Sequence, residues 1–334
     1  MNANAPSQAE PPAVATLSNQ QRNPGMALTP EMFESHAVNR SATQRRAATL
    51  VTRRSVKKEN QAAWLVNAIR CMDLTTLSGD DTEGRVRRLC AKARQPLSPE
   101  LVAGLGIADM KLTTGAVCVY PTMVPHAVKA LSGTDIPVAS VATGFPAGLM
   151  PLHLRLEEIR WAIGEGAGEI DIVITREHVL NRNWQALYDE IAQMRAACGL
   201  VHIKVILGTG DLQTLRNVYA ASMIAMQAGA DFIKTSTGKE TVNATLPVSL
   251  VMTRAIRDYR MATGYKVGFK PAGGMKSAKD ALNWQILMKE ELGNEWLKPD
   301  RFRLGASSML GDIERQLEHH ITGRYSAAHR HSVA

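Results

Sequence analysis

The sequence predicts a single α/β domain, a closed (β/α)8 TIM barrel, and three observations carry that prediction. Short apolar runs alternate with segments of helical periodicity, eight such runs are present, and their spacing is regular. Asp73 and Leu304 mark the first and last runs and lie 231 positions apart, so the mean repeat is about 33 residues, the size of a βα unit. An open doubly wound sheet stays an alternative, because the same units build both folds.

The eight apolar runs are the expected strands. Runs that are apolar on both faces are typical of a parallel sheet. The strands are expected at Cys71–Leu74, Ala116–Tyr120, Ala139–Thr143, Glu169–Ile174, His202–Leu207, Asp231–Thr235, Lys266–Lys270 and Phe302–Gly305. In a barrel, functional groups lie at the carboxyl ends of the strands, so the residues that end these runs are the first site candidates.

Helix signals lie between the runs. Apolar residues recur at helical spacing from Gln61, which predicts an N-terminal helix before the first strand. Ser98 followed by Pro99 indicates a helix start, and Thr245 is expected to cap a helix that begins at Leu246-Pro247.

Composition sets the domain boundaries. Of the 334 residues, 45% are hydrophobic and 21% are charged, which is enough apolar material for a core. Residues 1–58 hold eight basic and three acidic residues with few large apolar ones, so a disordered or extended basic tail is expected there. The barrel is expected over 59–323 and a flexible C-terminal tail over 324–334.

The net charge of +8 comes mainly from the tail, so no basic stripe points to nucleic acid on the folded part. A nucleic-acid binder that uses the tail is one alternative. No apolar window is long enough for a membrane span, and no membrane partner is expected. The four cysteines, at positions 71, 90, 118 and 198, lack metal-ligand spacing. They indicate reduced thiols in a cytoplasmic protein without a metal.

Two glycine-rich stretches fail as nucleotide motifs. The stretch 164–169 precedes a strand, whereas the dinucleotide motif follows one. Gly238-Lys239 resembles the end of a phosphate-binding P-loop, but Ile233 and Glu240 stand where that motif needs Gly and Ser or Thr. No nucleotide cofactor is expected.

Two lysines are the strongest functional signal. Lys234 and Lys270 each end an apolar strand, and the two strands are neighbours in the predicted barrel. Lysine is almost never fully buried unless it is paired. Neighbouring strands lie about 4.8 Å apart, so the two ammonium groups are expected at one mouth of the barrel. Like charge and desolvation lower a lysine pKa from about 10.4, which makes the amine a nucleophile for a Schiff base.

A carboxylate is available to the lysines. Asp171 lies within an otherwise apolar strand, where a charge needs a partner or a task. An internal ion pair with a lysine is one interpretation, and proton transfer during imine chemistry is another. Lys204 and Asp73 also lie on strands and rank second as candidates.

The last two strand-to-helix loops predict a phosphate site. Gly273 and Gly274 follow the seventh strand, while Ser307 and Ser308 follow the eighth and open a helix. Barrels commonly hold phosphate there with backbone amides and a helix N-terminus. A small phosphorylated substrate that reaches Lys234 is therefore expected.

Taken with these residues, the sequence resembles the deoxyribose-phosphate aldolases, a family of class I aldolases. The resemblance runs from about residue 60 to 320. Its stretches are Met72-Asp73-Leu74-Thr75-Thr76-Leu77, Val117-Cys118-Val119-Tyr120-Pro121, Glu169-Ile170-Asp171-Ile172-Val173, Phe232-Ile233-Lys234-Thr235-Ser236-Thr237-Gly238-Lys239, Gly268-Phe269-Lys270-Pro271-Ala272-Gly273-Gly274 and Phe302-Arg303-Leu304-Gly305-Ala306-Ser307-Ser308. Bacterial members often have Glu where this chain has Gly208.

The resemblance implies reversible cleavage of 2-deoxy-D-ribose 5-phosphate to acetaldehyde and D-glyceraldehyde 3-phosphate, without metal or cofactor, in deoxynucleoside breakdown. It implies Lys234 as the Schiff-base lysine, with Lys270 and Asp171 as proton-transferring residues. Phosphate ligands are expected among Gly238, Lys239, Gly273, Gly274, Ser307 and Ser308. Supporting residues are Lys204, Asp73, Thr75 and Cys118.

Alternatives to this function stay open at the level of sequence. Another class I aldolase or a transaldolase would use the same lysine chemistry on a different sugar phosphate. A non-catalytic sugar-phosphate sensor would keep the phosphate loops and form no imine. A homodimer or a higher homo-oligomer is possible.

Overall fold

The eight predicted strands form one closed ring in the computed structural model, which describes residues 22–331. The strands are β1 Met72–Thr75, β2 Ala116–Val119, β3 Val138–Ala142, β4 Glu169–Val173, β5 His202–Ile206, β6 Phe232–Lys234, β7 Gly268–Lys270 and β8 Leu304–Ala306. All neighbours are parallel, in the order β7-β6-β5-β4-β3-β2-β1-β8. Bridges from Phe269 to Phe302 and from Ala272 to Gly305 join the two ends. The barrel prediction is confirmed, and the open sheet is excluded.

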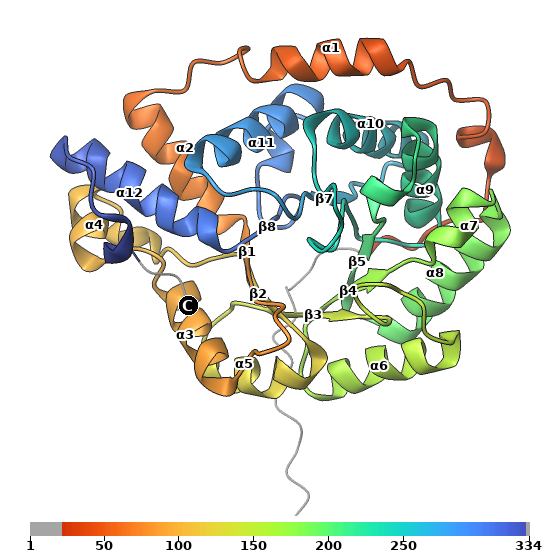
Figure 1. Ribbon diagram of the computed structural model, residues 1–334, viewed down its shortest axis with the longest axis horizontal. Helices are drawn as coiled ribbons and strands as arrows, with labels where there is room; N and C mark the ends of the chain where they lie inside the picture. The colour runs from red at the N-terminus through yellow and green to blue at the C-terminus, as the bar shows by residue number, and fades with distance from the viewer. Residues whose placement is uncertain (1–21, 332–334) are drawn as a thin grey trace, which may run out of the picture.

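Helices surround the strands on all sides (Figure 1). They are α1 Arg40–Leu50, α2 Lys58–Arg70, α3 Glu83–Arg94, α4 Pro99–Gly104, α5 Val124–Ala130, α6 Leu152–Gly164, α7 Arg176–Leu180, α8 Trp184–Cys198, α9 Leu215–Gln227, α10 Leu246–Thr263, α11 Ala278–Glu291 and α12 Ser308–Thr322. The predicted N-terminal helix is α2, and the Ser98 side chain caps α4 by accepting from the Leu101 amide. Thr245 precedes α10 as expected, but its side chain makes no capping hydrogen bond.

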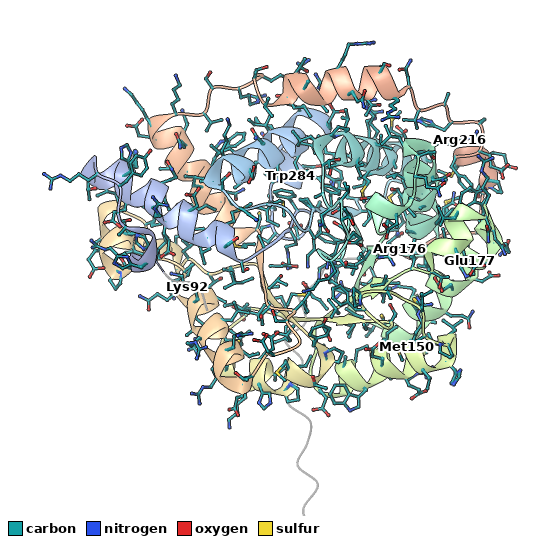
Figure 2. The ribbon with its side chains drawn as sticks, in the orientation of Figure 1. Lys92, Met150, Arg176, Glu177, Arg216 and Trp284 are labelled. Atoms are coloured by element: carbon teal, nitrogen blue, oxygen red, sulfur yellow. The ribbon has the colours of Figure 1, made fainter. Side chains whose placement is uncertain are left out.

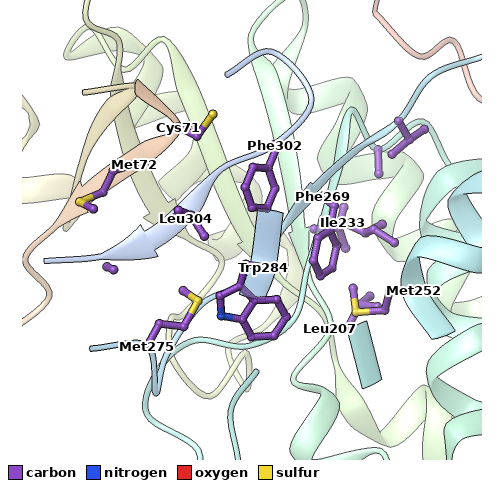
Figure 3. Packing of buried hydrophobic residues seen from close by; sticks show 14 of the residues in the cluster. Cys71, Met72, Leu207, Ile233, Met252, Phe269, Met275, Trp284, Phe302 and Leu304 are labelled. Carbon is purple, nitrogen blue, oxygen red and sulfur yellow. The ribbon is translucent and has the colours of Figure 1, made fainter. Parts of the chain in front are cut away.

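The main hydrophobic core lies between the strands and the helices. Figure 3 shows part of it, where Ile233 comes from β6, Phe269 from β7, Phe302 from the segment just before β8 and Trp284 from α11. The Ile233, Phe269 and Phe302 side chains are fully buried. Apolar packing therefore fixes the outside of the barrel, and the side chains that point into the barrel are left free to be polar.

The predicted tail is wrong for residues 22–58. Helix α1 forms there and lies across α10 and α11 (Figure 1), with Leu50 fully buried. Asn39 caps it by accepting from the Ala42 amide at 2.9 Å. Asn23 is also buried and donates to the carbonyls of Met226 and Ala230. A segment with few large apolar residues can order in this way because the barrel helices supply the opposing apolar surface.

The C-terminal end differs from its prediction in the same way. Tyr325 stacks on His319 with ring centroids 4.0 Å apart, and His331 is buried beside Glu318. The segment 324–331 is thus held on α12 through Tyr325, Ser326 and His331, although most of its residues are exposed. Residues 1–21 and 332–334 lie outside the described residues, so the predictions for them stay untested. No helix within 22–331 is long and apolar enough to cross a membrane.

Candidate active site

Four neighbouring strands carry the central charged side chains. Asp171 on β4 lies beside Lys204 on β5, and Lys234 on β6 lies beside Lys270 on β7 in the strand register. All four are buried, and the three lysines contact Asp171. They meet inside the barrel.

The Asp171 carboxylate joins the three lysines. Its Oδ2 accepts from Lys234 Nζ and from Lys270 Nζ, both at 2.8 Å, and its Oδ1 accepts from Lys204 Nζ at 2.9 Å. The two strand-end lysines therefore point at the same spot, as the sequence predicts. Lys204 contacts the same carboxylate, so the three ammonium groups have one anionic partner in common.

A second layer of charges lies beneath this contact. Asp73 accepts from Lys270 Nζ at 2.5 Å and from Arg303 Nη1 at 2.6 Å. Glu169 accepts from Arg303 Nη2 at 2.8 Å and from Lys204 Nζ at 2.5 Å. We call these seven side chains the polar network. It consists of Asp73, Glu169, Asp171, Lys204, Lys234, Lys270 and Arg303.

The polar network holds four basic groups and three carboxylates, so it is neutral only if one basic group loses its proton. An uncompensated charge inside a protein is costly, and a group that can shift its pKa neutralises instead. Arg303 cannot do so, because guanidinium stays protonated in proteins. A lysine can lose its proton in this way, and the polar network holds three.

Lys234 is the lysine whose pKa is lowered. Burial is the largest cause, and the neighbouring Lys270 ammonium adds to it, against the opposing effect of Asp171. For Lys270, burial alone would lower the pKa, but Asp171 and Asp73 outweigh it and raise the value. Lys204 follows Lys270, because Asp171 and Glu169 outweigh its burial. Lys234 is thus the basic group that can act as a neutral amine.

Asp171 is held as a carboxylate. Burial would raise its pKa, but Lys204, Lys234 and Lys270 together hold the pKa well below its ordinary value. It can therefore accept a proton from a group that approaches Lys234 and return it. Cys118, on β2, is fully buried, and burial raises the pKa of its thiol. It lies in a small apolar cluster with Leu77 and Val141 and is a neutral wall of the site.

A cavity of about 700 Å³ opens above Lys234 at the carboxyl ends of the strands. It is lined by every predicted phosphate residue: Gly238, Lys239, Gly273, Gly274, Ser307 and Ser308. Thr75 also lines it, whereas Asp171, Lys270, Asp73, Lys204 and Cys118 lie deeper. Ser308 is the first residue of α12, and the first amides of a helix have no acceptor within the helix. An anion at this end of the cavity would find donors there.

Some functional residues were missed from the sequence. Glu169 lies two positions before Asp171 on the same strand, and this spacing puts both on one face, so alternation could have found it. Arg303 interrupts an apolar run, which is a weaker signal. Arg85, Arg88 and Lys276 add positive charge to the cavity wall and come from helix α3 and a loop that no short motif marks.

Comparisons with known proteins agree with this geometry. The model of the DeoC/LacD family aldolases matches residues 67–288. A deoxyribose-phosphate aldolase of Bos taurus is 63% identical over 294 residues, which cover 87% of this chain and 92% of that protein. The deoxyribose-phosphate aldolase of Homo sapiens is 60% identical over 309 residues, covering 92% and 97%.

A solved structure shares the fold. The tetrameric deoxyribose phosphate aldolase from Aeropyrum pernix is 22% identical, with a TM-score of 0.57, and the match covers 84% of this chain and 99% of that one. The barrel with a lowered-pKa lysine inside it defines a class I aldolase scaffold. The chain belongs to the DeoC/LacD family of aldolases.

Proposed function

We propose that the chain catalyses the reversible cleavage of 2-deoxy-D-ribose 5-phosphate to acetaldehyde and D-glyceraldehyde 3-phosphate, through an imine on Lys234. The single observation that carries this proposal is the geometry of Lys234, a buried lysine with a lowered pKa at the base of a cavity with anion donors at its rim. The names of the bovine and human relatives, at 63% and 60% identity, support the substrate.

The steps follow from the positions of the three central groups. The neutral Lys234 amine attacks the C1 aldehyde of the open-chain sugar to give a carbinolamine. Protonation of the carbinolamine hydroxyl lets it leave as water, and the iminium forms. The Lys270 ammonium and Asp171 lie 2.8 Å apart and can carry the protons for this step.

Carbon–carbon cleavage then uses the iminium as the electron sink. A base removes the proton of the C3 hydroxyl, the C2–C3 bond breaks, and its electron pair moves to the iminium nitrogen. D-Glyceraldehyde 3-phosphate leaves, and an enamine stays on Lys234. Protonation at C2 and hydrolysis release acetaldehyde and restore the amine. Asp171, which contacts Lys234 at 2.8 Å, is our assignment for the proton transfers, either directly or through water.

The phosphate end and the partners complete the proposal. We assign the phosphate to Lys239, the 273–274 loop and the start of α12, all at the cavity rim. Neither a metal nor a cofactor is needed, since the imine itself accepts the electron pair. A cytoplasmic location and a homo-oligomer stay predictions. The tetramer is a property of the Aeropyrum pernix protein.

Borohydride trapping tests the proposal. The protein is mixed with acetaldehyde, reduced with sodium borohydride, digested and analysed by mass spectrometry. We expect one ethyl group on Lys234. An adduct on a different lysine, or none, would contradict the mechanism. Turnover of a panel of sugar phosphates then separates this function from another class I aldolase or a transaldolase, and turnover of none would indicate a sensor.

A further inference from the structure

The loops around the mouth of the barrel are tied together by one ion pair that the mechanism does not use. Arg176, the first residue of α7, contacts Glu240, which follows β6, with Nη2 and Oε1 3.1 Å apart. Both side chains are largely buried, with exposed fractions of 17% and 4%. We call this pair the Arg176–Glu240 clamp. Figure 2 labels Arg176 between the strands and the helices at the right of the view.

Glu240 holds the loop that follows Lys234. Its carboxylate accepts from the Thr237 amide at 3.0 Å, from the Thr237 hydroxyl at 2.7 Å and from the Gly238 amide at 3.2 Å. The Lys239 amide in turn donates to the Thr237 hydroxyl at 3.0 Å. All three amides of the loop are thus engaged internally. Gly238 cannot offer its amide to a phosphate while Glu240 holds it, so its role at the cavity rim is indirect.

Arg176 connects this loop to two others. It donates to the Ala147 carbonyl at 3.0 Å, in the loop after β3, and it lies 3.1 Å from Asp211, in the loop after β5. Gly208 shows how closely the guanidinium packs, because a Cβ at this position would lie 2.3 Å from Arg176 Nε. A side chain at position 208 would therefore require the Arg176 guanidinium to move.

The clamp explains how the exposed Lys239 side chain is directed to the cavity. The loop from Thr237 to Glu240 leaves β6 directly after the segment that carries Lys234, and a flexible loop would let Lys239 sample many directions. Bonds to a charged acceptor are stronger than neutral ones, and a buried ion pair restricts geometry. The clamp holds the loop through Thr237 and Gly238, and it makes no hydrogen bond to the reacting Lys234 side chain.

We infer that Arg176 and Glu240 are positioning residues for phosphate recognition: they fix the 237–239 loop so that Lys239 meets the phosphate of a phosphorylated sugar. This inference rests on the proposed function for its substrate. Loss of a pair that only stabilised the fold would affect both sugars equally. Loss of the clamp should instead weaken recognition of the phosphate more than recognition of the rest of the sugar.

The test uses Glu240→Gln, which keeps an oxygen acceptor and loses the charge, and Arg176→Lys, which keeps the charge and loses the forked reach. KM and kcat are measured for 2-deoxy-D-ribose 5-phosphate, and kcat/KM is measured for 2-deoxy-D-ribose. We expect the preference for the phosphorylated sugar to fall about tenfold, mainly through KM, which corresponds to the loss of one charge-assisted contact. Inhibition by inorganic phosphate should weaken in parallel.

Glu157→Gln is the matched control, because Glu157 is an exposed glutamate on α6 whose ion-pair partner is the neighbouring Arg160. It should leave the preference unchanged. An equal loss on both sugars in the clamp variants, or no loss, would overturn the inference. Borohydride trapping with acetaldehyde involves no phosphate, so its failure in the unaltered protein would count against the proposed function and not against the clamp.

Discussion

Lys204 and Lys234 are the same residue type on adjacent strands, both are buried, and both contact Asp171, yet their pKa values move in opposite directions. Lys204 belongs to the floor of the polar network, together with Asp73, Glu169 and Arg303. Lys234 belongs to its mouth, together with Asp171 and Lys270. The two regions are built from the same chemical groups and differ only in how the charges are shared.

The number of carboxylates around each cation decides the difference. In the floor, Lys204 contacts two carboxylates, at 2.5 and 2.9 Å, and Arg303 also contacts two, one of which, Glu169, it shares with Lys204. At the mouth, Lys234 contacts Asp171 alone, and Asp171 also serves Lys204 and Lys270. Burial penalises every ammonium, and only sufficient opposite charge offsets the penalty. The nucleophilic lysine is therefore the one that contacts the fewest carboxylates.

The largest expected effect is at the mouth. Lys234→Met should abolish turnover and the borohydride adduct, because no other lysine in the network combines a lowered pKa with access to the cavity. Mass spectrometry of the acetaldehyde-treated variant measures this. Lys129→Met, at an exposed position on α5, serves as the control and should keep the adduct. An adduct of normal yield in Lys234→Met would show that a residue other than Lys234 is the nucleophile.

A second change alters the mouth without removing the nucleophile. Lys270→Met should lower kcat by about 10²–10⁴, the usual effect of losing a proton-transfer group. It also removes an ammonium that lowers the pKa of Lys234 and leaves Asp171 with fewer partners, so the pKa of Lys234 should rise. Less free amine then exists at a given pH, and the acid limb of imine trapping should move to higher pH. Near-normal activity at pH 7, with the acid limb of trapping at the same pH as in the unaltered protein, would refute the claim that Lys270 lowers the pKa of Lys234.

A third change addresses the floor. Arg303→Met leaves Asp73 and Glu169 with one cation partner each, so two buried carboxylates lose compensation. The free energy of unfolding should fall by about 3–5 kcal/mol, the usual cost of breaking a buried ion pair. Urea unfolding followed by circular dichroism measures it. The acid limb of imine trapping should move less than in Lys270→Met. A larger movement would mean that the charges of the floor set the pKa of Lys234 as strongly as those of the mouth.

The smallest expected effect is that of removing divalent cations, which should change nothing. All six carboxylate oxygens of Asp73, Glu169 and Asp171 already accept from a lysine or an arginine, so a divalent cation would have to displace one of these cations. We expect EDTA to leave kcat unchanged. Loss of activity that returns on adding a divalent cation would show that a metal replaces one of these cations in the working enzyme.

The N-terminal segment shows where sequence patterns mislead. Residues 22–58 have the composition of a disordered tail, yet Phe33, Ala47 and Leu50 are buried against the barrel helices. Composition measures what a segment can bury against itself. It does not register apolar surface that distant helices offer, and so the order of this segment could not be predicted locally.

Periodicity and residues close together in the chain were enough to predict the barrel, the two strand-end lysines, the buried aspartate and the glycine and serine loops that line the cavity. Three features required the folded arrangement: the lowering of the Lys234 pKa where those of the other two lysines are raised, the contact of Glu169 with Arg303, and the contact of Arg176 with Glu240. These outcomes depend on charges tens to hundreds of positions apart in sequence and about 3 Å apart in space, and electrostatic energy depends on that distance and on burial, not on separation along the chain.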